Sequence, residues 1–299
     1  MTTRVGPVAA VLLVATGIIA AAGVLHARDT RAPLPPSQER LMYLRSGRVA
    51  DRAFLTFDAV AADVYWMRAI QHYGRDRRSL RQDGRFELLQ PLLDLTTTLD
   101  PYFNIAYRFG AIFLAMDPPN GPGRPDQAID LLLKGLEHRP DRWQYAHDIG
   151  FVHYWYTGDF TAAASWFDRA AEMPEAPGWI RQVAAVTLVE GGDRAGARRI
   201  LSELLTSATD DYIRNAAERS LQQVQALDAI DELNGLIEQY RERTGGLPSV
   251  WGDLVRARML PGLPVDSTGT PFAYDSSTGV VSLGAGSTLL PLPRGLSAR

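Results

Sequence analysis

A short motif recurs in this chain after 34 residues. Gly158-Asp159 is repeated as Gly192-Asp193, and small and apolar residues follow each copy at the same offsets. The corresponding pairs are Ala163 and Ala197, Phe167 and Leu201, and Ala170 and Leu204. A repeat of this length indicates one pair of helices per unit, joined by a tight turn. Because one pair alone leaves an apolar face exposed, the units are expected to stack on one another.

Three consecutive units follow this register over roughly residues 86–207. The central unit, 143–175, has Ile149-Gly150 in its first helix, and the unit before it carries a Pro/Gly-rich insertion at 117–125. The other matching residues are Tyr107, Gly110, Ala111, Leu114, Ala128, Leu132, Gly135 and Pro140 before it, and Ala184, Ala185 and Leu188 after it. The pattern resembles the tetratricopeptide repeat (TPR). This resemblance implies a mainly α fold, an α-solenoid of TPR-like helical hairpins whose first helices line a concave face.

The segment at residues 5–25 contains 21 residues without a charge. As a helix it would be about 31 Å long, which is enough to cross the hydrocarbon core of a bilayer. We therefore assign 1–31 to a transmembrane anchor or signal segment, with cleavage at Ala20-Ala21-Ala22 as the alternative. Basic residues flank the segment almost equally, so they encode its orientation only weakly. Since a very short N-terminal tail stays most easily in the cytoplasm, we expect a single-pass inner-membrane protein with a periplasmic body.

A linker is expected at 32–52, beginning with the stiff stretch Ala-Pro-Leu-Pro-Pro. We place the TPR-like solenoid at 53–224, and we expect a helix at 53–73 that caps its first unit. Apolar residues surround this helix: Val60, Val64, Met67 and Ile70 on one side, and Tyr65, Trp66, Ala69 and Tyr73 on the other. A helix that is apolar nearly all round should be packed on both sides.

A small α+β module is expected at 225–284, and a flexible tail at 285–299. Helical periodicity starts at Asp210-Asp211 and stops at Gly245-Gly246, which is a natural C-terminal cap. The segments expected after it are a short helix at 250–258 and two strands at 272–274 and 280–283, which form a hairpin around a glycine-containing turn.

The same module resembles the globular end of the type II secretion major pseudopilins over about residues 229–284. The matching residues are Tyr240, Gly245, Pro248, Asp266, Gly269, Pro271, Phe272, Tyr274 and Asp275. The hydrophobic stretch at 5–25 lacks the processed pseudopilin motif and lies over 200 residues upstream of the module. No acidic residue follows Leu283, where the family places its calcium loop. The resemblance therefore implies a borrowed cap or docking surface, and not a pilus subunit or a calcium site.

Composition restricts the chemistry of this chain. The net charge of −3 and the pI near 6.0 give no basic field for nucleic acid. Cysteine is absent, which excludes disulfides, thiolate metal sites and a cysteine nucleophile. The five histidines include no pair at i, i+4, and neither a P-loop nor a G-x-S-x-G motif occurs. We expect no metal, no cofactor and no catalysis, with an envelope enzyme of unrecognised active site as the alternative.

The repeat register also predicts a binding groove on the concave face. Its residues are Arg108, Ile112 and Met116 from the unit before 143, then Gln144, His147, Phe151, Tyr154 and Trp155, then Trp179, Gln182, Val186 and Glu190. An aromatic strip with polar spots suits a peptide or helix of another protein. Two alternatives stay open: a terminal segment of this chain fills the groove, or the aromatic residues only pack between units.

These observations predict a membrane-anchored TPR scaffold that binds a protein partner through the concave face and the membrane through residues 5–25. The pseudopilin resemblance suggests a partner in a secretion or pilus-like envelope complex. The alternative is an adaptor with the same fold whose body lies on the cytoplasmic side of the membrane.

Overall fold

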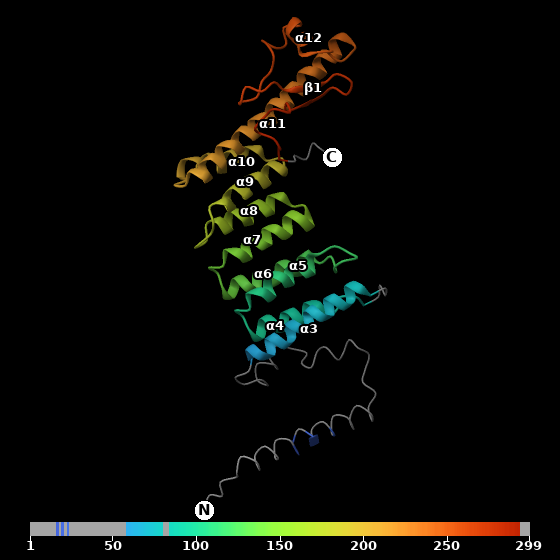
Figure 1. Ribbon diagram of the computed structural model, residues 1–299, viewed down its shortest axis with the longest axis vertical. Helices are drawn as coiled ribbons and strands as arrows, with labels where there is room; N and C mark the ends of the chain where they lie inside the picture. The colour runs from blue at the N-terminus through green and yellow to red at the C-terminus, as the bar shows by residue number, and fades with distance from the viewer. Residues whose placement is uncertain (1–15, 18, 21–22, 24–57, 80–83, 294–299) are drawn as a thin grey trace, which may run out of the picture. The chain divides into compact units, whose positions relative to one another are not determined.

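The computed structural model describes residues 16–17, 19–20, 23, 58–79 and 84–293 (Figure 1). Most of the expected anchor, all of the linker at 32–52 and the last residues, 294–299, lie outside this set. Among the described residues, no helix has the length and hydropathy that a membrane span requires. These residues form ten α-helices, one π-helical turn and a two-stranded antiparallel sheet near the C-terminus. A mainly helical fold with a small C-terminal sheet is therefore confirmed.

The chain divides into two compact units, which are described separately. The first contains α3 (Asp58–Arg78) up to Asp76, and α4 (Leu89–Leu99). The second contains everything from Pro101 onward and residues 77–85. Its elements are α5 (Asn104–Ala115), α6 (Pro125–His138), α7 (Trp143–Val152), the π-helical turn η1 (His153–Thr157), α8 (Phe160–Ala171), α9 (Trp179–Glu190), α10 (Arg194–Ser207), α11 (Asp211–Thr244), α12 (Trp251–Arg256), β1 (Ala273–Asp275) and β2 (Val280–Ser282).

Helix α3 in the first unit buries only one side. Alanines and tyrosines form its buried stripe: Ala61, Ala62, Tyr65, Ala69 and Tyr73. Val60, Val64 and Met67 are 58%, 46% and 53% exposed. The expectation that this helix is packed on both sides is therefore wrong. Small residues on the buried stripe allow close packing there, whereas the larger aliphatic residues face outward.

The helices of the second unit pack in chain order. Each helix from α5 to α10 contacts the next one, and α5 also contacts α7, as α9 contacts α11 (Figure 1). The residues that the repeat assigns to packing positions are buried: Tyr107, Gly110, Ala111, Leu114, Ala128, Leu132, Gly135, Ile149, Gly150, Ala163, Phe167, Ala170, Ala184, Ala185, Leu188, Ala197, Leu201 and Leu204. These buried positions agree with the 34-residue register, whereas Pro140, which also matches the repeat, is exposed.

The repeated Gly-Asp pair has the same geometry in both copies. Gly158 and Gly192 have left-handed backbones, with φ of 68° and 88°, which glycine adopts without a steric penalty. The aspartate that follows is an N-cap in both places. The carboxylate of Asp159 accepts a hydrogen bond from the backbone N–H of Ala162, and that of Asp193 accepts one from Gly196. One local motif therefore ends the first helix and begins the second.

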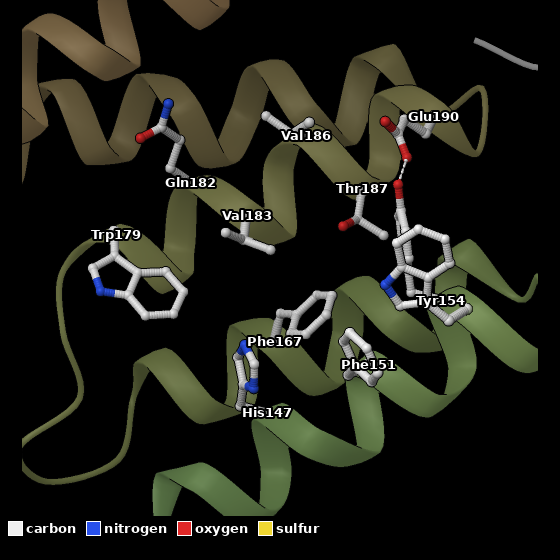
Figure 2. A pocket seen from close by; sticks show the side chains of 11 residues that line it. His147, Phe151, Tyr154, Phe167, Trp179, Gln182, Val183, Val186, Thr187 and Glu190 are labelled. Atoms are coloured by element: carbon white, nitrogen blue, oxygen red, sulfur yellow. Dashed lines mark hydrogen bonds between the residues drawn. The ribbon is translucent and has the colours of Figure 1, made fainter. Parts of the chain in front are cut away.

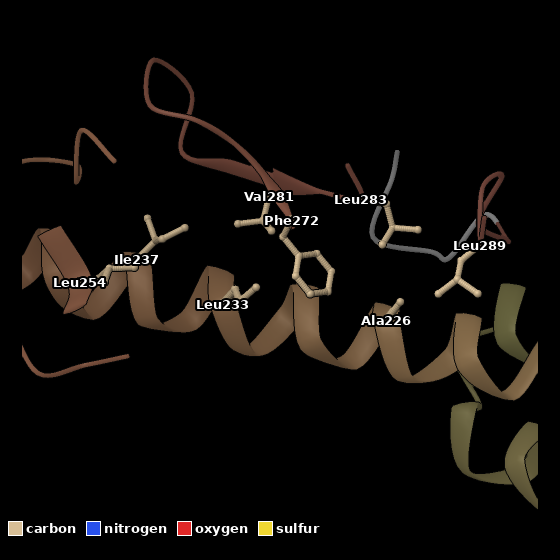
Figure 3. Packing of buried hydrophobic residues seen from close by; sticks show 8 residues of the cluster. All are labelled: Ala226, Leu233, Ile237, Leu254, Phe272, Val281, Leu283 and Leu289. Atoms are coloured by element: carbon tan, nitrogen blue, oxygen red, sulfur yellow. The ribbon is translucent and has the colours of Figure 1, made fainter. Parts of the chain in front are cut away.

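The C-terminal module is built on the second half of α11 (Figure 3). Asp210 caps this 34-residue helix through the backbone N–H of Tyr212, and Gly245 ends it at φ 79°. One continuous helix therefore spans the boundary predicted at 224. Apolar residues of α12 and of the hairpin, among them Leu254 and Val281, pack on α11. The buried cluster consists of Ala226, Leu233, Ile237, Leu254, Phe272, Val281, Leu283 and Leu289.

The predicted hairpin is present, but its first strand lies one residue later than predicted and its second strand ends at Ser282. β1 pairs with β2 in antiparallel register, with Tyr274 opposite Val281. In the loop before β1, the carboxylate of Asp266 accepts hydrogen bonds from the backbone N–H groups of Thr268 and Thr270. It also accepts one from the hydroxyl of Ser287. Burial alone would raise the pKa of Asp266, but these hydrogen bonds outweigh burial and lower the pKa below its ordinary value.

Residues 285–293, which belong to the predicted flexible tail, pack against α11 and the module. Leu289 is 1% exposed and belongs to the module's buried cluster. The side chain of Gln223 donates hydrogen bonds to the backbone oxygens of Leu289 and Pro291. Arg219 likewise donates to the backbone oxygens of residues 288 and 290. The tail prediction is therefore wrong for 285–293, because α11 supplies polar partners that the local sequence does not reveal.

Candidate functional site

A pocket of about 420 Å³ lies between α7 and α9 of the second unit (Figure 2). It is referred to below as the α7–α9 pocket. Its lining residues are His147 and Phe151 of α7, Tyr154 and Trp155 of η1, Phe167 of α8, and Trp179, Gln182, Val183, Val186, Thr187 and Glu190 of α9. A volume of this size lies within the usual range of ligand pockets, which is roughly 300–1,000 Å³.

Eight of the twelve predicted groove residues line this pocket: His147, Phe151, Tyr154, Trp155, Trp179, Gln182, Val186 and Glu190. The other four, Arg108, Ile112, Met116 and Gln144, do not. Arg108 and Ile112 lie on α5, and Met116 is the C-cap residue that follows this helix. None of the eleven lining residues comes from α5. The pocket therefore brings together predicted groove residues from two of the three units.

Three lining residues were not among the predicted ones: Phe167, Val183 and Thr187. Phe167 is the residue that corresponds to Leu201 in the 34-residue repeat. It is 4% exposed, and a Cβ atom on Gly150 of α7 would lie only 2.7 Å from its ring. Phe167 therefore packs against α7 and also forms the floor of the pocket. Val183 and Thr187 each follow a predicted residue by one position, so the pocket wraps further around α9 than expected.

A π-helical turn shapes one end of the pocket. Residues 153–157 leave the α-helical pattern at the end of α7, and the hydroxyl of Thr157 donates to the backbone oxygen of His153 at 2.9 Å. A π turn is wider than an α turn, so it changes the direction of the side chains that it carries. Tyr154 and Trp155, which both line the pocket, lie on this turn. The sequence contains no recognised signal for it.

Tyr154 is joined to Glu190 at this end. The tyrosine hydroxyl donates a hydrogen bond to Oε2 of the carboxylate, linking η1 to the last residue of α9 (Figure 2). The ring of Trp155 lies 5.5 Å from that of Tyr154 and 6.2 Å from that of Phe151. Trp155 is 64% exposed, so a large apolar side chain stands at the pocket's edge in contact with solvent.

Trp179 and Gln182 mark the opposite end of the pocket (Figure 2). The ring of Trp179 meets that of His147 edge to face, with centroids 5.8 Å apart, and it is 41% exposed. The amide nitrogen of Gln182 donates to the hydroxyl of Ser220 on α11 at 3.1 Å. Gln182 is therefore held by the neighbouring helix, and the two ends of the pocket are fixed by different parts of the fold.

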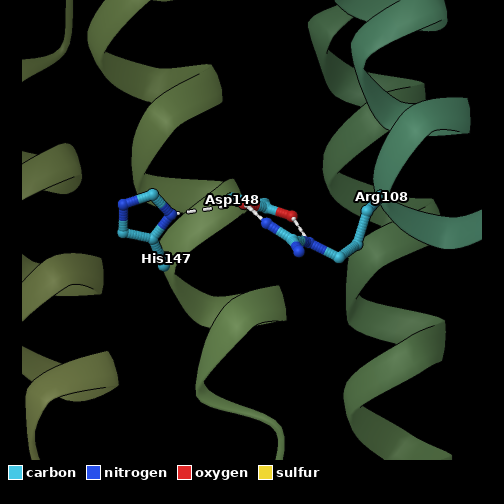
Figure 4. A network of polar contacts seen from close by, with 3 residues as sticks. All are labelled: Arg108, His147 and Asp148. Carbon is cyan, nitrogen blue, oxygen red and sulfur yellow. Dashed lines mark hydrogen bonds and ion pairs between the residues drawn. The ribbon is translucent and has the colours of Figure 1, made fainter. Parts of the chain in front are cut away.

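A polar network supports the pocket from behind α7 (Figure 4). Arg108 of α5 donates two hydrogen bonds to the carboxylate of Asp148, at 2.5 and 3.1 Å. Nδ1 of His147 lies 3.2 Å from the same carboxylate. The hydrogen bond from Arg108 to Asp148 raises the pKa of Arg108 above its ordinary value despite partial burial. Arg108 thus acts on the site through Asp148, which orients the imidazole ring of His147.

The lining offers few groups for a metal or for catalysis. Three lining residues have ionisable side chains: Glu190, His147 and Tyr154. Across residues 58–79 and 84–293, no three His, Asp or Glu side chains gather in a way that could hold a metal ion. The pocket combines six aromatic or heteroaromatic rings with a small number of polar atoms, a composition typical of binding sites.

Comparison of the chain with protein-family models, with curated proteins and with solved structures gave no match. The TPR and pseudopilin resemblances therefore rest on the motifs of the chain itself.

Proposed function

We propose that this protein is a TPR-type scaffold that binds a segment of a partner protein in the α7–α9 pocket. The observation that carries the proposal is the pocket itself, which gathers rings from three consecutive helices and the π turn. Trp155 and Trp179 are exposed at its two ends although both are large and apolar. Rigid aromatic side chains of this kind supply much of the affinity in protein–protein recognition. The packing of successive helices in chain order supports a solenoid of helical hairpins as the framework.

In this proposal the activity is non-covalent. Residues 5–25 tether the scaffold to the membrane, and tethering raises its effective concentration near other envelope proteins without any further contact. The C-terminal module, which shares α11 with the helical repeat, provides a second surface close to the pocket, since Gln182 of the pocket binds Ser220 of the same helix. The pseudopilin resemblance of this module points to a secretion or pilus-like complex as the source of the partner.

Cross-linking in membranes tests the proposal. The full-length chain would be cross-linked in cells, extracted in detergent and isolated together with its partners. Tyr154→Ala and Trp155→Ala should each remove a specific partner while the helical circular dichroism is retained. Tyr212→Ala is the matched control, because Tyr212 is 75% exposed on α11 and lies outside the pocket lining. Recovery of the same partners by all three variants would show that the pocket is not the binding site.

A second experiment tests the orientation. A reporter that is active only in the cytoplasm, or only outside it, would be fused to the C-terminus of the full-length chain. We expect activity of the extracytoplasmic reporter. Activity of the cytoplasmic reporter alone would instead support an adaptor that faces the cytoplasm.

A further inference from the structure

The charge of the α7–α9 pocket is unbalanced. Its lining includes one carboxylate, that of Glu190, and contains no arginine or lysine. The nearby Arg108 does not offset this charge, because its guanidinium donates two hydrogen bonds to Asp148. A ligand group that enters the pocket therefore meets a net negative charge at one end.

Glu190 is only partly satisfied within the described structure. Its Oε2 atom accepts the hydrogen bond from Tyr154, which is a neutral donor. No hydrogen bond or ion pair from a described residue reaches its other oxygen, Oε1. Glu190 is half-buried at the end of α9. A partly desolvated carboxylate is stabilised more by a cationic donor than by a neutral one, since charge-assisted hydrogen bonds are roughly twice as strong.

Three aromatic rings form a corner beside this carboxylate. Trp155 lies 6.2 Å from Phe151 and 5.5 Å from Tyr154, and the ring planes are inclined at 50° and 75°. Such inclined rings present both faces and edges to the space between them. The face of an aromatic ring carries partial negative charge and attracts cations, most strongly when the ring is an indole. The carboxylate and the rings therefore favour the same kind of group.

We propose that this end of the pocket binds an arginine side chain of the partner protein. The guanidinium would lie on the rings of Trp155 and Phe151 and donate a hydrogen bond to Oε1 of Glu190. Arginine fits better than lysine, because the planar guanidinium stacks on rings and is less strongly hydrated than an ammonium group. An acidic or purely apolar side chain would leave Glu190 without a cationic partner. The inference rests on the proposed function, since it names the chemical group that the partner brings.

Fluorine NMR on the full-length chain tests this inference directly. The six tryptophans would be labelled with 5-fluorotryptophan, and Trp155 and Trp179 would be assigned by single replacements with phenylalanine. The probes are three capped peptides, acetyl-Ala-X-Ala-amide, in which X is arginine, lysine or citrulline. Citrulline has nearly the shape of arginine but no charge. Each peptide is titrated to millimolar concentration into the wild-type chain, into Glu190→Gln and into Glu232→Gln, an exposed glutamate on α11 that serves as control.

The arginine peptide should shift the Trp155 resonance in a saturable way, and the lysine peptide should bind more weakly. Replacing arginine by citrulline, or Glu190 by glutamine, should weaken binding about tenfold, because either change removes the charge-assisted contact. Glu232→Gln should bind like the wild type. Equal binding of the arginine and citrulline peptides, equal binding by Glu190→Gln, or no saturable shift at all would overturn the proposal.

Two further outcomes separate the possible explanations. If a chain that ends at residue 293 has a different Trp155 resonance before any peptide is added, the occupant is the chain's own end, which includes Arg294 and Arg299. That result would overturn an arginine from a partner. If Glu190→Gln still captures the cross-linked partner while Trp155→Ala does not, the arginine contact is wrong but the scaffold proposal stands. If both variants capture the partner, the scaffold proposal itself fails.

Discussion

The hydroxyl of Tyr154 donates a hydrogen bond to the carboxylate of Glu190, a residue 36 positions later in the chain. The first residue lies on the π-helical turn after α7, and the second is the last residue of α9. This contact connects two adjacent repeat units across the α7–α9 pocket. It fixes the position of the pocket's carboxylate and of the aromatic corner beside it.

Tyr154→Phe removes this hydrogen bond while it keeps the ring. We expect the free energy of unfolding to fall by about 1 kcal/mol. The charged acceptor strengthens this hydrogen bond, whereas partial exposure to solvent reduces its net contribution. Urea unfolding followed by circular dichroism measures the change. Tyr212→Phe is the control, since Tyr212 is 75% exposed and should give the wild-type value. Equal stability of the two variants would mean that the contact contributes nothing to folding.

Gly150 allows α7 and α8 to approach closely. A Cβ atom at this position would lie 2.7 Å from Cδ1 of Phe167 and 3.0 Å from the backbone oxygen of Ala163. Gly150→Ala should therefore lower the free energy of unfolding by about 1–3 kcal/mol, despite the better helix propensity of alanine.

Gly235→Ala is the matched control for this prediction, because nothing lies within 4 Å of a Cβ atom at Gly235 in α11. Here alanine should raise stability by roughly 0.5–1 kcal/mol. Thermal unfolding of both variants gives the comparison. A Gly150→Ala protein as stable as the wild type would show that the α7–α8 crossing adjusts without cost.

Leu289 anchors the C-terminal segment in the core of the module. It is 1% exposed, whereas Leu263 on the loop before β1 is 57% exposed. Leu289→Ala should cost about 2–4 kcal/mol through lost burial and the remaining cavity. Leu263→Ala should change stability by less than about 0.5 kcal/mol. Hydrogen exchange should also show faster opening around Gln223 in Leu289→Ala. If the two substitutions have similar effects on stability, residues 285–293 are not part of the module.

His72 makes the stability of the first unit depend on pH. Burial lowers the pKa of His72 from its ordinary value of 6.5, although the neighbouring Asp76 acts in the opposite direction. The unfolded chain therefore binds a proton more readily than the folded chain. Stability from this group is fully present above pH 6.5 and is lost as the pH falls below that value.

His72→Gln should remove this contribution, so its unfolding free energy should change less between pH values above and below 6.5 than that of the wild type. Urea unfolding of both proteins at several pH values gives the two slopes. The other four histidines, at 26, 138, 147 and 153, remain in both proteins, and their effects cancel in the difference. The same slope for both proteins would refute the assignment.

Local interactions account for the features that could be predicted from the sequence. Glycine at a left-handed position and aspartate at an N-cap act within a few residues, so Gly158-Asp159 and Gly192-Asp193 predict where helices end and begin. Helical spacing likewise predicts which side chains of each repeat are buried. The hairpin and the end of α11 at Gly245 follow from turn and cap residues in the same way.

The way in which these local features combine into a site depends on long-range packing. Whether Phe167 only fills the space between helices or also lines a pocket depends on where α9 lies, and no short segment encodes that distance. The hydrogen bond that joins the π turn to Glu190 and the packing of Leu289 in the module likewise involve residues far along the chain. Side-chain contacts between distant residues stabilise one arrangement among many that the local pattern allows. The repeat therefore specifies the helices, and long-range packing specifies the pocket between them.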